Sequence, residues 1–238
     1  MSLAGQAAIV TGAGRGIGRA IAVAFSRAGA AVVLAARTGR ELEAVAREIG
    51  DTGGRALAVT ADVSDEAGAG ALVKRALAEH GRVDILVAAA GAAAFSTFAD
   101  MKVADWDRIV AVNLRGAMLC CQAVLPAMMG QRRGTIINIG SVVTSRALAG
   151  SAAYTASKYG LLGFSRVLAE EMRPHGVRVG TLAAGATDTP LWDAIHGAPD
   201  RRLMLRPEQV ARAAVLMASL EPNAALEEMT LLPAGGVL

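Results

Sequence analysis

Residues 7–18 read AAIVTGAGRGIG, a short apolar run that passes directly into a turn with glycine at every second position. An apolar run of this length, bounded by glycine, is typical of a buried strand. Apolar side chains then recur at helical spacing from about residue 16 to 28. The stretch therefore predicts a strand that turns at once into a helix, the opening unit of a parallel α/β sheet.

The alternation of strand and helix continues along the whole chain. Strands are predicted at 7–11, 31–35, 56–59, 83–87, 134–139, 176–182 and 229–232, and helices at 16–28, 41–49, 65–79, 106–129, 154–172 and 207–219. Strands separated by helices predict a seven-stranded parallel sheet covered on both faces, with a ligand crevice beyond the carboxyl ends of the strands. No linker divides the chain, so we expect residues 1–238 to form a single-domain, Rossmann-type doubly wound α/β sandwich.

Composition narrows the classes of function. The chain is 53% hydrophobic and 19% charged, which excludes a disordered chain. No uninterrupted apolar stretch reaches the ~18 residues of a membrane span, and no basic stretch precedes the first apolar run as in a secretory signal. We therefore expect a soluble, cytoplasmic protein with no membrane partner. The net charge is +3, but the arginines are dispersed without interleaved aromatic residues, so no nucleic-acid partner is expected.

Cysteine and histidine usage argues against two further kinds of site. Cys120 and Cys121 are adjacent within an apolar helical pattern, so they predict buried thiols rather than a disulfide framework. His80, His175 and His196 lie far apart, with no carboxylate or cysteine at ligand spacing. The sequence therefore predicts no metal site.

The glycine-rich turn favours a dinucleotide. Gly12, Gly16 and Gly18 fit the spacing G-x-x-x-G-x-G, whereas Ile17 breaks the spacing G-x-G-x-x-G. Such a turn lets the backbone approach a pyrophosphate and aims the amino terminus of the helix at it. The alternative is a tight turn with a structural role alone. The position of the glycine-rich turn directly after the first strand favours nucleotide binding over a structural role alone.

The end of the second predicted strand indicates which dinucleotide. A free ribose 2′-hydroxyl is usually held by an Asp or Glu some 20 residues beyond the glycines. Between Gly18 and Glu41 the charged side chains are all arginines: Arg19, Arg27, Arg37 and Arg40. Arg37 follows the strand and Arg15 lies in the glycine turn, so the pair predicts a 2′-phosphate site and NADP(H) in preference to NAD(H). The alternative is that both arginines are solvated loop residues.

Tyr154 and Lys158 form a candidate catalytic pair. Four residues apart in a helical pattern, they lie on one face of the helix. A phenol has a pKa of about 10, and a neighbouring ammonium favours the phenolate, so Lys158 is expected to lower the pKa of Tyr154. The other tyrosine, Tyr159, has Gly163 at this spacing and no partner. The alternative is an amphipathic helix with two exposed polar residues.

Together with the glycine turn, these residues resemble the short-chain dehydrogenase/reductase family over nearly the whole chain. The family's Tyr-x-x-x-Lys is similar to Tyr154 and Lys158, its serine after the fifth strand to Ser141, and its helix asparagine to Asn113. The resemblance implies that Tyr154 donates a proton to a substrate carbonyl oxygen to which Ser141 also bonds. It also implies that Lys158 holds the nicotinamide ribose and that Asn113 anchors a proton-supplying water.

The resemblance also implies a set of cofactor contacts along the strand ends. They are Gly12, Gly14, Arg15, Gly16, Ile17, Gly18, Arg37, Asp62, Val63, Ala90, Gly91, Tyr154, Lys158, Gly185, Thr187 and Thr189. The sequence departs from the family at two places. Ala88-Ala89-Ala90-Gly91 replaces the common Asn-Asn-Ala-Gly, and Gly180 and Ala184 stand where asparagine and proline are frequent.

The expected function is an NADP(H)-dependent oxidoreductase acting on a ketone or secondary alcohol. A 3-oxoacyl thioester is one candidate substrate, because an acidic acyl carrier would suit the basic corner at Arg132 and Arg133. The loop after Ser141 and segments 93–98 and 190–206, with Trp192, His196 and Met204, are expected to select the substrate. The alternative is a nucleotide-binding protein of the same fold with weak or no catalysis. The resemblance implies a homodimer or homotetramer built through the helices of Asn113 and Tyr154.

Overall fold

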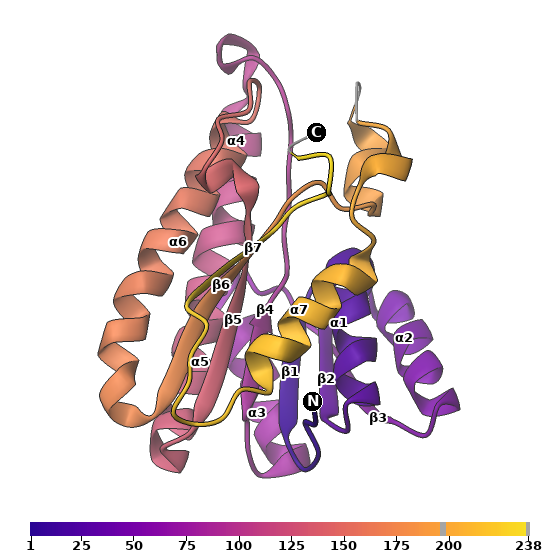
Figure 1. The fold of residues 1–238 in the computed structure, drawn as a ribbon, viewed down its shortest axis with the longest axis vertical. Helices are drawn as coiled ribbons and strands as arrows, with labels where there is room; N and C mark the ends of the chain where they lie inside the picture. Colours follow the sequence, from indigo (N-terminus) through magenta and orange to yellow (C-terminus); the bar gives the residue numbers. More distant parts are fainter. Residues whose placement is uncertain (196–198, 237–238) are drawn as a thin grey trace.

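One parallel sheet runs through the centre of the molecule (Figure 1), in a computed structural model that describes residues 1–195 and 199–236. Within these residues seven strands lie in the order β3-β2-β1-β4-β5-β6-β7. They are β1 (Ala7–Thr11), β2 (Ala31–Ala36), β3 (Arg55–Thr60), β4 (Ile85–Ala88), β5 (Gly134–Ser141), β6 (Val177–Ala184) and β7 (Glu228–Leu231). Every neighbouring pair is parallel, which confirms the predicted Rossmann-type architecture.

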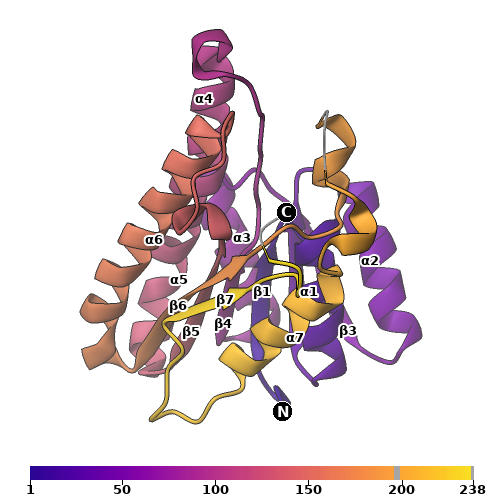
Figure 2. The same cartoon turned by 45° about the horizontal axis from the view of Figure 1, so that its top comes forward.

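Helices cover both faces of the sheet, as the turned view shows (Figure 2). One layer contains α1 (Gly16–Arg27), α2 (Gly39–Asp51) and α7 (Pro207–Ala218). The other contains α3 (Glu66–His80), α4 (Val103–Val110), α5 (Gly116–Gln131) and α6 (Ala152–Met172). The strands are apolar on both sides because each side is buried against a helical layer.

Strand β1 shows how the two layers share one strand. Ala8 and Val10 pack in the core with α1 and α7, whereas Ile9 between them packs in the core with α3 and α5. All three are buried. Successive side chains of a strand point to opposite faces, so the four consecutive apolar residues of β1 serve two cores.

The long helix differs from the prediction. Helices α4 and α5 join through a π-helical turn (Ala111–Arg115) into one helix, Val103–Gln131, three residues longer at its start than predicted. By length and composition alone, with a window of mean hydropathy 1.5, this helix could cross a membrane, but Arg115 interrupts the apolar residues of that window. In this fold 44% of that window is buried, and Leu119, Cys120, Cys121 and Val124 pack in the core beside α3.

The packing around Gly180 in β6 explains why glycine stands where the family often has asparagine. A Cβ atom at Gly180 would lie 2.2 Å from the carbonyl oxygen of Leu226 and 2.8 Å from the Met217 side chain. The segment before β7 therefore passes too close to β6 for the asparagine that the family often has here. Glycine is required by the packing of this segment.

Substituting Gly180 with alanine is expected to destabilise the protein by about 1–3 kcal/mol, the usual cost of forcing extra atoms into a packed region. Urea unfolding of the wild-type and variant proteins measures the difference. The control is Gly163→Ala in α6, where no atom lies within 4 Å of an added Cβ, and which should keep or raise the stability. Equal unfolding midpoints for Gly180→Ala and wild type would show that Leu226 moves aside at no cost.

Candidate active site

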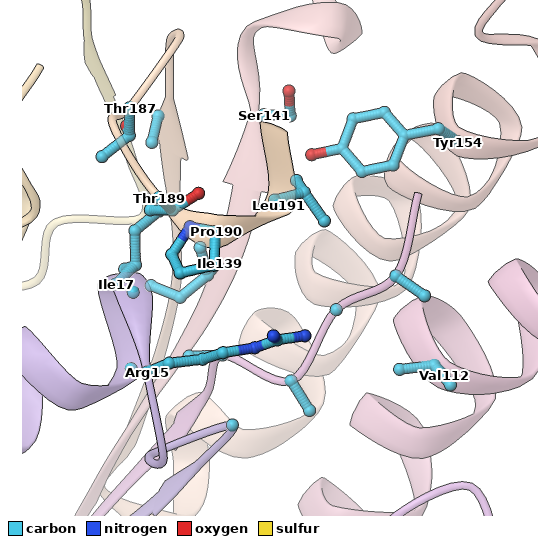
Figure 3. Close-up of a pocket in the computed structure, with 18 of the residues that line it drawn as sticks. Arg15, Ile17, Val112, Ile139, Ser141, Tyr154, Thr187, Thr189, Pro190 and Leu191 are labelled. Carbon is cyan, nitrogen blue, oxygen red and sulfur yellow. The ribbon is translucent and has the colours of Figure 1, made fainter. Parts of the chain in front are cut away.

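The strand order reverses between β1 and β4, and a cavity of about 400 Å³ opens beyond the carboxyl ends of the strands at this point. Its walls come from the ends of β1, β2, β4, β5 and β6 and from the segment that follows β6. Figure 3 shows part of this lining, with residues of the glycine turn facing residues at the end of β5 and in the segment after β6. This is the crevice predicted for a doubly wound sheet.

The glycine turn forms one wall of the cavity. Gly12 has a φ of +65°, and a Cβ at this position would lie 2.8 Å from the carbonyl oxygen of Ala89. A Cβ at Gly18 would lie 2.3 Å from the carbonyl oxygen of Gly12. The chain thus passes through the turn only with glycine at both positions. Helix α1 starts at Gly16 without a side-chain cap, which leaves N–H groups at its amino terminus to bind an anion.

The turn after β4 is held from two sides. The Thr11 hydroxyl oxygen accepts bonds from the N–H groups of Ala89 and Ala90, both at 3.1 Å. Asn113 accepts a bond from Ala92 N–H at 2.7 Å and donates one to the Ala92 carbonyl at 2.9 Å. Thr11 and Asn113 therefore position this turn without the two asparagine side chains that are absent from the sequence.

Asn113 lies behind the cavity wall. It is buried in the π-helical turn, and its Nδ2 also donates to Ser157 Oγ of α6 at 3.0 Å. Isolated π-helical turns are frequent at functional sites. Its side chain links the turn after β4 to α6, so it is a positioning residue here. The implied role in anchoring a water stays a prediction.

Tyr154 and Ser141 face each other in the cavity. The phenol of Tyr154, in the first turn of α6, points toward Ser141 at the end of β5 (Figure 3). Burial raises the pKa of Tyr154, and the Ser141 hydroxyl beside it opposes this rise with a smaller effect. The phenol therefore stays protonated at neutral pH, the form that can donate a proton.

Lys158 lies one turn further along α6 and is buried, with 5% of its surface exposed. Its Nζ donates to the carbonyl oxygen of Ile139 at 2.7 Å and lies 5.7 Å from the centroid of the Tyr154 ring. Burial lowers the pKa of Lys158 to about 8. The predicted lowering of the Tyr154 pKa is wrong in this structure, because the burial of the phenol has the larger effect.

An aromatic wall adjoins the phenol. The Phe95 ring lies between Tyr154 and Trp192. Its centroid is 6.2 Å from that of the Tyr154 ring and 6.3 Å from that of the Trp192 ring. The Trp192 indole donates to the Thr187 carbonyl at 2.9 Å. Two of the segments expected to select the substrate therefore meet at this wall, and Leu148 from the loop after Ser141 also lines the cavity. Of the other residues expected there, Met204 is buried away from the lining, and His196 lies outside the described residues.

The far end of the cavity is charged. Arg15 and Arg37 are both exposed and line it, and Figure 3 shows Arg15 extending from the glycine turn into the cavity. Asp62, after β3, accepts bonds from the Ser64 hydroxyl at 2.7 Å and the Ser64 N–H at 2.9 Å. These bonds, with the charge of Arg37, lower the pKa of Asp62. This end of the cavity therefore holds the carboxylate of Asp62 as well as the two arginines.

The structure brings the predicted site residues together almost completely. All of them line the cavity except Asn113, which lies behind its wall. Sequence reasoning missed Glu41, Arg108 and Arg146, which also line it. The sequence does hold a signal for Glu41. It is an acidic residue little more than 20 residues beyond the glycines, close to the spacing usual for a residue that binds the ribose. No group of three metal ligands occurs in residues 1–195 and 199–236.

The Rossmann-type sheet, the glycine turn and the Ser141–Tyr154–Lys158 arrangement define a dinucleotide-dependent oxidoreductase. The chain belongs to the short-chain dehydrogenase/reductase family, since the family profile described as short chain dehydrogenase matches residues 6–199. This confirms the resemblance seen in the sequence.

Individual relatives share this family but differ in what their names state. D-threitol dehydrogenase of Mycolicibacterium smegmatis is 38% identical over 91% of this chain and 87% of its own length. A 3-oxoacyl-[acyl-carrier-protein] reductase of Synechocystis is 36% identical over 94% of this chain and 93% of its own. The crystal structure of a metagenomic short-chain oxidoreductase in complex with NADP is 40% identical, with a TM-score of 0.87, and the match covers 98% of this chain and 99% of that one.

Proposed function

We propose that this protein is an NADP(H)-dependent oxidoreductase that interconverts a ketone and a secondary alcohol. The observation that carries the proposal is one continuous cavity with Tyr154, Ser141 and Lys158 at one end and Arg15 and Arg37 at the other. The glycine turn fits a dinucleotide, because it leads the chain tightly into the amino terminus of α1, whose uncapped N–H groups can bind phosphates. When bound, the nicotinamide supplies or accepts the hydride at the substrate carbon.

Side chains of this protein donate the proton and bind the carbonyl oxygen of the substrate. In the direction of reduction, Tyr154 donates its phenolic proton to the carbonyl oxygen of the substrate as the hydride reaches the carbon. Ser141 donates a hydrogen bond to the same oxygen and stabilises the charge that develops there. The pKa of Tyr154, raised by burial, keeps the phenol protonated before reaction.

Lys158 supports the phenol electrostatically. With a pKa of about 8, its amine is mostly protonated at pH 7. The bond to the Ile139 carbonyl holds this cation near the Tyr154 ring. The positive charge then stabilises the phenolate that forms when Tyr154 gives up its proton.

The preference for NADP(H) is tested at Arg37. Arg37→Ala is expected to lower kcat/KM for NADPH by about 10- to 100-fold, the worth of one charge-assisted hydrogen bond, and to leave kcat/KM for NADH within about twofold. Steady-state kinetics with both cofactors measures this, with Arg27→Ala as the control because Arg27 is exposed on α1 outside the cavity. A lower KM for NADH than for NADPH in the wild-type enzyme would overturn the assignment.

The substrate end favours an apolar carbonyl compound. Leu148, Leu191 and Trp192 line it, and Phe95 stacks against Trp192. This apolar surface suits an acyl chain or a hydrophobic ketone better than a polyol. A 3-oxoacyl thioester remains a candidate. A screen of NADPH oxidation with acyl thioesters, simple ketones and sugars distinguishes these classes.

The predicted basic entrance for an acyl carrier needs correction. Arg132 ends α5 and Arg133 precedes β5, whereas Ser141 lies at the other end of that strand. The rise of about 3.3 Å per residue separates the two ends of β5 by roughly 20 Å. The basic corner therefore lies far from the cavity, and Arg108 and Arg146 are the basic residues at the substrate end.

The remaining expectations stay predictions. As part of the proposed function, we expect the protein to be cytoplasmic and to assemble into a homodimer or homotetramer. Tyr159 and Val167 on α6 are exposed apolar side chains, which supports burial of this helix face against a second copy. The two missing asparagines favour the alternative of a nucleotide-binding protein without catalysis, but Thr11 and Asn113 hold the turn after β4 in their absence.

A further inference from the structure

Glu41 places a carboxylate at the charged end of the cavity. It lies in the first turn of α2, and its side chain folds back against the glycine turn. A Cβ atom at Gly14 would lie only 2.7 Å from Glu41 Oε2 and 3.0 Å from Glu41 Cβ. Glu41 also lines the cavity together with Arg15 and Arg37. A carboxylate and two guanidinium groups therefore border the same space.

The carboxylate of Glu41 is available to a ligand. Within the part of the chain that the structure describes, its oxygen atoms form no hydrogen bond or ion pair. Glu48, two turns further along the same helix, is by contrast paired with Arg19 at 2.7 Å. Negative charge in the first turn of a helix is stabilised by the helix dipole. Glu41 is thus a carboxylate acceptor without a hydrogen-bond partner among the described residues, at the edge of the cavity.

The chemistry of this position depends on the ribose of the dinucleotide. A carboxylate accepts hydrogen bonds from a ribose diol, which is the usual way to recognise a free 2′-hydroxyl. The same carboxylate repels a 2′-phosphate, which carries up to two negative charges. Arg15 and Arg37 favour the 2′-phosphate, because their positive charges attract it. The site therefore holds the recognition groups for both kinds of ribose.

We propose that Glu41 is a specificity-determining residue that accepts a hydrogen bond from the 2′-hydroxyl of NAD(H) and weakens the binding of NADP(H) by repelling its phosphate. The inference rests on the proposed function, because it requires a nicotinamide dinucleotide in the cavity. Its consequence is that the wild-type protein binds both cofactors, with a preference for NADP(H) smaller than the two arginines alone would produce.

The test measures binding without turnover. Fluorescence titrations with NADPH and NADH give both dissociation constants for the wild-type protein, Glu41→Gln and Glu41→Lys. Glu41→Gln is expected to tighten NADPH binding by about tenfold, because the charge that repels the 2′-phosphate is lost. It is expected to weaken NADH binding by about threefold, because the acceptor for the 2′-hydroxyl is no longer charged. Glu41→Lys reverses the charge and is expected to move the ratio of the two constants further in the same direction.

Glu43→Gln is the matched control. Glu43 is exposed on the same helix, outside the cavity, and its loss changes the net charge by the same amount. The proposal is overturned if Glu41→Gln leaves the ratio of the two dissociation constants within twofold of the wild-type value, or if Glu43→Gln shifts that ratio equally. Binding of neither cofactor by the wild-type protein would instead overturn the proposed function itself.

Discussion

Replacing Tyr154 with phenylalanine is expected to lower kcat by about 10³-fold or more while NADPH still binds with a dissociation constant within about twofold of the wild-type value. The substitution removes the phenolic proton and leaves the ring beside Phe95. A positioned general acid contributes about 10²- to 10⁴-fold to the rate, and in this cavity the proton of the substrate oxygen comes from this hydroxyl. Ketone reduction and fluorescence titration with NADPH measure the two quantities.

Tyr159→Phe is the control for this experiment. Tyr159 follows on the same helix but is 51% exposed and lies outside the cavity. Its loss of a hydroxyl should leave kcat unchanged. Wild-type turnover by Tyr154→Phe would show that another group donates the proton, and the mechanism proposed here would have to be abandoned.

Replacing Lys158 with methionine is expected to remove most of the activity and to stabilise the protein at pH 7. Burial lowers the pKa of Lys158 from 10.5 to about 8. Below about pH 8 the amine is charged in both the folded and unfolded states, and the folded state carries the full cost of burying the charge. That cost is about 3 kcal/mol, offset in part by the bond to the Ile139 carbonyl.

The pH dependence identifies the cause of this stabilisation. Between about pH 8 and 10.5 the unfolded lysine binds a proton more strongly than the folded one, so the stability of the wild-type protein rises with pH relative to the variant. The advantage of Lys158→Met in free energy of unfolding should therefore shrink between pH 7 and about pH 9.5. Urea unfolding at both pH values measures it.

Lys74→Met provides the reference, since Lys74 is exposed on α3. It should show no gain in stability at pH 7 and no pH-dependent difference from the wild type. A Lys158→Met protein that is less stable than the wild type at both pH values, by the same amount, would show that burial of the ammonium costs little. Such a result would also remove the argument for a lowered pKa of Lys158.

Much of this protein was predictable because its signals are local. The run at 7–11 followed by Gly12 defines β1 and its turn through the backbone of neighbouring residues. Tyr154 and Lys158 lie one turn apart on any helix that contains both. Such relations depend on the rise per residue and need no knowledge of the rest of the chain.

Other features required contacts between distant segments. The need for glycine at 180 comes from the carbonyl of Leu226, and the turn after β4 is held by Thr11 and Asn113, which are far from it in the sequence. The reach of Glu41 back to Gly14 depends on how α2 packs beside the glycine turn. None of these contacts has a periodic signal along the chain.

The sequence by itself determined the order of strands and helices along the chain and the crevice beyond the carboxyl ends of the strands, because periodicity and spacing follow from backbone geometry. Only the tertiary structure decided the protonation behaviour of Tyr154 and Lys158, the distance of Arg132 and Arg133 from the cavity, and the presence of Glu41 at the ribose end. Burial, desolvation and the approach of charges are properties of the packed molecule, and they exist only once segments far apart in the chain are in contact.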